Sequence, residues 1–121
     1  MGEKLKHEIR VYKVENFTVV NVRGKIDSTN SEEAEIDLNL ILENVDKFYI
    51  FDLCGLEYIS SAGLRVFLTA SKKIKNHKGA FVLCEVSEEV REVFDITGLL
   101  NVFTLCGTLD AAVEKMKSLC S

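Results

Sequence analysis

The sequence predicts a single α/β domain over residues 1–121, with a mixed, mainly parallel sheet, an N-terminal antiparallel hairpin strand and about four helices. Three observations support this fold class. After the first hairpin, apolar stretches of strand length alternate with stretches of helical spacing, which implies parallel strands joined by right-handed crossovers. Hydrophobic residues make up 47% of the chain and charged residues 28%, as in ordinary globular proteins. A chain of 121 residues can bury about two-thirds of its unfolded surface and has no room for a second domain.

The first third of the chain predicts a β-hairpin and a helix. Residues 8–14 and 17–23 have the composition of strands, and Glu15-Asn16 separates them as a hairpin turn does. Candidate N-cap residues at 28–31 precede an acidic stretch, which is typical of a helix N-terminus. This helix should end near Asn44. Its apolar face follows a spacing of four, three and four residues: Ala34, Leu38, Ile41 and Val45.

The middle third predicts the central strand and a second helix. Residues 48–53 form a continuous apolar and aromatic run, as expected of a strand that is covered on both faces. A loop that contains Gly55 should follow this strand. Ser60 or Ser61 would then cap a helix with lysines toward its C-terminal end, where cations are favourable, and Gly79 would end it.

The last third predicts two further pairs of a strand and a helix. Residues 80–84 form a short buried strand, and Ser87 and Gly98 mark the start and the end of the helix that follows. Residues 102–105 form the last strand, after which Thr108 caps the final helix. One face of this helix carries apolar residues at helical spacing: Leu109, Ala112, Val113, Met116 and Cys120.

Charge and composition argue against several classes of partner. The 15 basic and 19 acidic residues give a net charge of −4, and no stretch collects five or more basic residues, so nucleic acid and anionic membranes are not expected to bind. No apolar run approaches the roughly 18 to 20 residues that span a bilayer, so we expect no membrane insertion and a cytoplasmic location. The 4 cysteines contain no C-x-x-C pair and are expected to be free, mostly buried thiols.

The sequence also argues against an enzyme, a bound metal or a cofactor. Gly24-Lys25 lacks the spacing of a phosphate-binding loop, and the glycines are too dispersed for a dinucleotide-binding turn. Ser61 is followed by Ala62-Gly63 as in half of a nucleophile elbow, but neither His7 nor His77 should reach its hydroxyl. Both histidines are expected at the surface, too isolated to hold a metal ion.

Polar residues are expected at the carboxyl ends of the parallel strands, where α/β sheets meet ligands and partners. Asp27 and Asp52 could form a pair of acids there, but the favoured interpretation is that each accepts hydrogen bonds from a helix N-terminus or a turn amide. Cys54 and Cys84 could be neighbours on adjacent strands and sensitive to oxidation, or could pack as small apolar side chains.

Three segments together resemble the STAS domain family, which is named for sulfate transporters and anti-sigma factor antagonists. They are D-L-C-G-L-E-Y-I-S-S-A-G-L at 52–64, G-K-I-D at 24–27 and V-F-D-I-T-G-L at 93–99. Their order and spacing fit the alternating pattern, so the resemblance covers nearly the whole chain and implies one STAS domain. A free-standing STAS domain of this length resembles a bacterial anti-sigma factor antagonist, which binds a serine kinase that otherwise sequesters a sigma factor.

The resemblance also implies a phosphorylation site and a partner surface. Aligning the glycine of the family's D-[ST]-[ST]-G motif places the phosphorylated residue at Ser61, with Ser60 in place of the acid and as a second candidate acceptor. The anti-sigma factor serine kinase would modify Ser61, and a serine phosphatase would reverse the modification. The implied partner surface consists of residues at and near this site: Asp27, Ser60, Ser61, Ala62, Gly63, Leu64 and Arg65.

General electrostatics supports such a switch at Ser61. The unmodified residue would be a small neutral cap beside Ala62 and Gly63, whose size lets another protein approach closely. Phosphorylation adds about −1.5 to −2 charges. A poorly paired charge in a fitted interface costs roughly 2 to 5 kcal/mol, which is enough to separate bound from free states.

Two other functions stay open on the sequence alone. The first is a STAS scaffold subunit of a stress-signalling or lipid-transport complex that is never phosphorylated, in which Ser60 and Ser61 serve only as N-caps. The second is binding of a small ligand or nucleotide at the same edge of the sheet, for which the sequence lacks a basic or glycine-rich loop.

Overall fold

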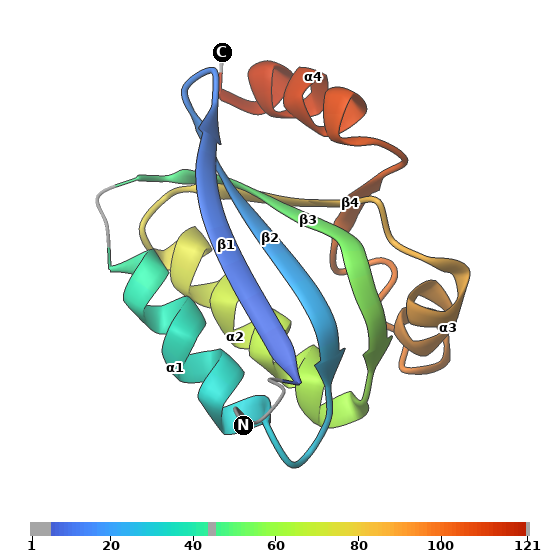
Figure 1. Cartoon of the computed structure of the whole chain (residues 1–121). Helices are drawn as coiled ribbons and strands as arrows, with labels where there is room; N and C mark the ends of the chain where they lie inside the picture. Colours follow the sequence, from blue (N-terminus) through green and yellow to red (C-terminus); the bar gives the residue numbers. More distant parts are fainter. Residues whose placement is uncertain (1–5, 44–45, 121) are drawn as a thin grey trace.

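The computed structural model describes residues 6–43 and 46–120. A five-stranded sheet has helices on both faces, and its strands lie side by side in chain order (Figure 1). The elements are β1 (His7–Val14), β2 (Phe17–Ile26), α1 (Ser31–Leu42), β3 (Phe48–Ile59), α2 (Ser61–Asn76), β4 (Ala80–Cys84), α3 (Glu88–Ile96), β5 (Thr104–Cys106) and α4 (Leu109–Cys120).

The pairing of the strands confirms the predicted fold class. β1 is antiparallel to β2 and lies at the edge of the sheet, while β2, β3, β4 and β5 are parallel to one another. The hairpin turn at Glu15 and Asn16 joins β1 to β2, and Glu15 has a φ of 56° there. Each parallel connection contains a helix, as right-handed crossovers require.

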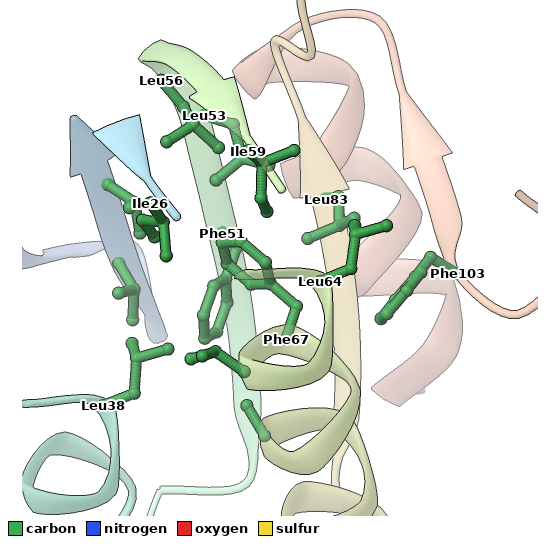
Figure 2. Packing of buried hydrophobic residues seen from close by; sticks show 14 of the residues in the cluster. Ile26, Leu38, Phe51, Leu53, Leu56, Ile59, Leu64, Phe67, Leu83 and Phe103 are labelled. Atoms are coloured by element: carbon green, nitrogen blue, oxygen red, sulfur yellow. The ribbon is translucent and has the colours of Figure 1, made fainter. Parts of the chain in front are cut away.

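The two faces of the sheet carry separate apolar cores. α1, α2 and α3 cover one face, where the Phe51 ring lies 5.8 Å from the ring of Phe67 (Figure 2). The Phe51 ring also lies 4.4 Å from the ring of Phe81. α4 covers the other face with Ala112, Val113 and Met116. Cys120, expected on the same helix face, is the last residue of α4 and is exposed.

The central strand is longer than predicted. Residues 54–59, expected in a loop, continue β3 and pair with the end of β2 as far as Ile26 and Ile59. The register shifts twice along this pairing, after Asn21 and after Gly24. Gly55 leaves room for the Arg23 side chain on the neighbouring strand, because a Cβ atom at position 55 would lie 2.7 Å from Cγ of Arg23. The extension brings the end of β3 directly to the start of α2.

Several element boundaries differ slightly from the sequence-based expectation. α1 ends at Leu42, which is buried, whereas its predicted end near Asn44 and the predicted core residue Val45 lie outside the described residues. β5 is confined to Thr104–Cys106, so it begins two residues later than expected. The caps of the last two helices are confirmed, because Ser87 accepts a hydrogen bond from the Val90 amide and Thr108 accepts one from the Ala111 amide.

His7 is buried, and the expectation of a surface imidazole is wrong for this residue. Its Nε2 donates to the Asp37 carboxylate at 2.9 Å, and the side-chain amide of Asn30 donates to its Nδ1 at 3.0 Å. The ring therefore links β1 to the start of α1, a contact that depends on tertiary packing. His77 is exposed, as expected.

The cysteines are free, as predicted, but they are not mostly buried. Cys84 is buried and Cys106 half-buried, whereas Cys54 and Cys120 are exposed. In the described part of the chain, each helix is too short or too polar to cross a membrane.

Candidate functional site

The segment around Ser61 lies where β2 and β3 end and α2 begins. The Ser60 amide donates to the carbonyl oxygen of Ile26 at 2.9 Å, which ties the start of the helix to the end of β2. The hydroxyl of Ser60 accepts a hydrogen bond from the Gly63 amide at 3.3 Å. Ser60 is therefore the N-cap, one of the two alternatives that the sequence left open.

Ser61 is the first residue of α2 and is exposed to solvent. Because Ser60 caps the helix, the expectation that Ser61 is itself a cap is wrong. The hydroxyl of Ser61 makes no hydrogen bond or ion pair with the residues that the structure describes. The hydroxyl is thus accessible to another protein, while the backbone beside it is held by the hydrogen bond to the end of β2.

Gly63 and Leu64 face the interior, which corrects their expected place on the partner surface. A Cβ atom on Gly63 would lie 2.6 Å from Cγ1 of Ile59 and 2.9 Å from the carbonyl oxygen of Ile26. Glycine therefore permits close approach of the helix to its own sheet, not of another protein. Leu64 is 1% exposed and lies within the core beside Phe67 (Figure 2).

Asp27 follows the last residue of β2 and is held in one orientation. Its carboxylate accepts hydrogen bonds from Nζ of Lys6 at 2.8 Å and from the amide and hydroxyl of Thr29 at 2.8 Å and 2.6 Å. The hydrogen bond from Lys6 is the main reason that the pKa of Asp27 lies well below its ordinary value, and the bonds from Thr29 add to it. The turn-amide interpretation of Asp27 is confirmed.

Lys6 is a component of the site that sequence reasoning missed. It lies 21 residues before Asp27, and its ammonium also donates to the Thr29 hydroxyl at 2.7 Å. The contact follows from the hairpin register, since the Lys25 amide donates to the Lys6 carbonyl at 2.8 Å. No local pattern in the sequence signals a pair that only strand pairing creates.

The accessible part of the expected surface is small and carries a free cation. Asp27, Ser60 and Ala62 are partly exposed, while Ser61 and Arg65 are exposed. The side chain of Arg65 makes no ion pair or hydrogen bond within residues 6–43 and 46–120. Since Lys6 neutralises Asp27, Arg65 gives the unmodified site a local charge of about +1.

Asp52 does not join Asp27 in a pair of acids. It lies in the middle of β3, seven residues before Ile59, which pairs with the residue preceding Asp27. At about 3.3 Å per residue this separates the two acids by roughly 23 Å or more along the strands. Asp52 is buried, and its carboxylate accepts a hydrogen bond from the Cys54 amide at 3.1 Å.

Cys84 lies beside Asp52, in register with it on β4. Burial, followed by the nearby Asp52 charge, raises the pKa of the Cys84 thiol to about 12. This thiol is therefore a poor nucleophile, which favours the packing interpretation of the sequence. Within residues 6–43 and 46–120, no three His, Cys, Asp or Glu side chains gather as a metal site.

Comparison with known proteins places this geometry in a family. The sequence profile of the STAS domain matches residues 8–112. A candidate anti-sigma factor antagonist of Bordetella bronchiseptica, BtrV, is 36% identical over 88% of this chain and 91% of its own length. The anti-sigma-B factor antagonist of Bacillus subtilis is 30% identical over 83% of this chain and 91% of its own length.

Solved structures agree on the fold. An anti-sigma factor antagonist from Mycobacterium paratuberculosis has a TM-score of 0.82 and 24% identity, over 92% of this chain and 94% of that one. The phosphorylated form of the Bacillus cell fate determinant SpoIIAA has a TM-score of 0.65 and 17% identity, over 89% of this chain and 98% of that one. The chain belongs to the STAS domain family.

Proposed function

We propose that this chain is a cytoplasmic anti-sigma factor antagonist that binds an anti-sigma factor serine kinase and thereby releases a sigma factor. Binding uses the start of α2 with Ser61 unphosphorylated. The observation that carries the proposal is the Ser61 hydroxyl, which is exposed and unbonded at the first position of a helix anchored to the end of β2. The names of the two relatives support the same role.

The partner surface consists of the accessible residues Asp27, Ser60, Ser61, Ala62 and Arg65. The small side chain of Ala62 leaves the first turn of α2 open to close approach, while Gly63 and Leu64 hold this turn against the sheet from below. A fitted interface of this kind depends on the size and charge of the residue at 61. The chain acts here as a binding module and performs no catalysis.

Phosphorylation by the kinase ends the interaction. A phosphate brings about −1.5 to −2 charges and a bulky tetrahedral group to the centre of the surface. The helix dipole accommodates this charge in the free protein, but a closely fitted partner must desolvate it. A serine phosphatase then restores the binding form.

Two variants of Ser61 test the proposal in a capture experiment with lysate of the native host. Ser61→Ala should capture a serine kinase of the anti-sigma type, and Ser61→Asp should capture at least tenfold less, since each 1.4 kcal/mol is about tenfold in affinity. Thr69→Asp, an exposed position two turns further along α2, controls for added charge and should bind like the wild type. Equal capture by the two Ser61 variants would exclude the switch.

A second candidate function is a scaffold subunit of a stress-signalling or lipid-transport complex that is never phosphorylated. The specific observation in its favour is that Ser60 stands where the family motif has an acid. Phosphopeptide mass spectrometry of the protein from its host, across growth and stress conditions, separates the two. Modification at Ser61 in any condition favours the switch, and an unmodified peptide in all conditions favours the scaffold.

A further inference from the structure

Arg65 lies one helical turn beyond Ser61 on the same face of α2. Residues four apart in a helix have Cβ atoms about 5 to 6 Å apart. Helical side chains also tilt toward the N-terminus, so that each covers the turn before its own Cα atom. The guanidinium of Arg65 can therefore reach the space directly above the Ser61 hydroxyl.

Both side chains are free to meet. Each is exposed, and neither makes a hydrogen bond or ion pair with any residue in the described ranges. Among the first amides of the helix, only that of Gly63 donates a hydrogen bond to the Ser60 hydroxyl. The amides of Ser61 and Ala62 precede the first possible intrahelical acceptors and still point outward.

We infer that Arg65 is the intramolecular counter-ion of a phosphate on Ser61, an inference that rests on the proposed phosphorylation of this residue. The phosphate oxygens accept charge-assisted hydrogen bonds from the planar guanidinium, which presents paired donors to such groups. The positive end of the helix dipole adds to this attraction. The first turn of α2 contains no acidic side chain to compete.

This pairing makes the effect of phosphorylation on partner binding larger than the phosphate charge alone would. In the unmodified protein the free guanidinium contributes about +1 to the surface and is available to an acidic group of a partner. After phosphorylation the same guanidinium folds back onto the phosphate, and the local charge becomes about −0.5 to −1. The local charge of the surface thus changes sign, and at the same time the Arg65 guanidinium is no longer available to a partner.

Other charges near the site do not replace Arg65. Lys6 is bound to Asp27 and Thr29. Lys25 at the end of β2 and Glu57 in β3 carry opposite charges and are exposed. All of these groups are unchanged in an Arg65 variant, so a comparison with the wild type isolates the guanidinium.

The test installs phosphoserine at position 61 by genetic encoding, which requires no knowledge of the kinase, and follows the phosphate by 31P NMR during a pH titration. The second pKa of a phosphoserine lies near about 6. Arg65→Ala should raise this pKa by about 0.2 to 0.4 of a unit, as loss of a helical ion pair implies, and Arg65→Lys should retain part of the effect. Lys72→Ala, an exposed cation further along α2, is the matched control and should leave the value unchanged.

The outcome is separable from that of the proposed function. Equal phosphate pKa values in the wild type and Arg65→Ala would overturn the inference while leaving kinase binding intact. Conversely, Arg65 would still lower the pKa of the encoded phosphate if Ser61 were never modified in the host. Thermal unfolding of the unphosphorylated Arg65→Ala protein should match the wild type, because a purely structural role would lower its Tm.

Discussion

The amide of Ser60 donates a hydrogen bond to the carbonyl oxygen of Ile26 at 2.9 Å, and this bond joins the first residue before α2 to the last residue of β2. Ile26 in turn pairs with Ile59. The position of Ser61 therefore depends on the register of two parallel strands, and not on a flexible loop. A partner that binds at Ser61 contacts a surface that is already ordered, which lowers the entropic cost of binding.

Gly63→Ala should destabilise the fold although alanine is the better helix former. A methyl group at this position would lie 2.6 Å from Ile59 Cγ1 and 2.9 Å from the Ile26 carbonyl oxygen. Overpacking of this kind costs about 1 to 3 kcal/mol, against a helix-propensity gain of about 1 kcal/mol at most. Urea unfolding measures the difference. Gly107→Ala is the control, since a Cβ atom there has no neighbour within 4 Å; equal stability of the two variants would contradict the packing argument.

Ser60→Ala should lower the free energy of unfolding by about 1 kcal/mol, because the Gly63 amide loses its cap. Ser60→Asp should recover this loss, since a carboxylate caps the amide and interacts favourably with the helix dipole. Ser61→Ala should stay within about 0.5 kcal/mol of the wild type. Chemical denaturation of the three variants checks the order, and a larger loss for Ser61→Ala than for Ser60→Ala would reverse the assignment of the cap.

Asp27→Asn should lower stability near neutral pH, and the deficit should shrink in acid. Hydrogen bonds from Lys6 and Thr29 hold the folded-state pKa of Asp27 below its unfolded value of about 3.9. A depressed pKa contributes stability above the unfolded pKa, and this contribution is lost as the pH falls through the folded-state pKa. Denaturation at pH 7 and at steps below about pH 4 measures the trend. Asp95→Asn, an exposed change on α3, is the control and should stay within about 0.5 kcal/mol of the wild type at pH 7. A constant deficit for Asp27→Asn would refute the linkage.

Alkylation at pH 8 should distinguish the cysteines of the folded protein. Cys84 is buried with a pKa of about 12 and should be modified only after unfolding. Cys54 and Cys120 are exposed and should react in the folded state. Cys54 should be the slower of the two, because partial burial and then Asp52 raise its pKa. Peptide mass spectrometry with and without denaturant gives the result, and modification of Cys84 in the native protein would show that its side of the sheet opens.

Local patterns in the sequence were enough to predict the order of the elements. Glu15-Asn16 between two β-rich stretches predicted the hairpin, and Ser87 and Thr108 predicted two helix starts that their hydrogen bonds confirm. These features depend on neighbours within three or four residues. The family motif likewise identified the segment around Ser61, which is the exposed first residue of α2.

Contacts between distant segments were not predictable in this way. Gly55 was expected in a loop, yet it lies in β3, where it pairs with Arg23 of β2 and leaves room for the side chain of that residue. His7 was expected at the surface, yet Asn30 and Asp37 of another element enclose it. Leu64 was expected on the partner surface, although its helical position faces the sheet.

The amino-acid pattern thus specifies which segments become strands and helices, because hydrophobic period and capping chemistry act over a few residues. Strand register and helix orientation specify what those segments present to solvent. Residues 60–65 illustrate the division: their types predict a capped helix start, but the packing of this helix on Ile26 and Ile59 turns Gly63 and Leu64 inward and Ser61 and Arg65 outward. The physical reason is that burial is a property of surfaces brought together by the whole fold, which no short stretch of chain contains.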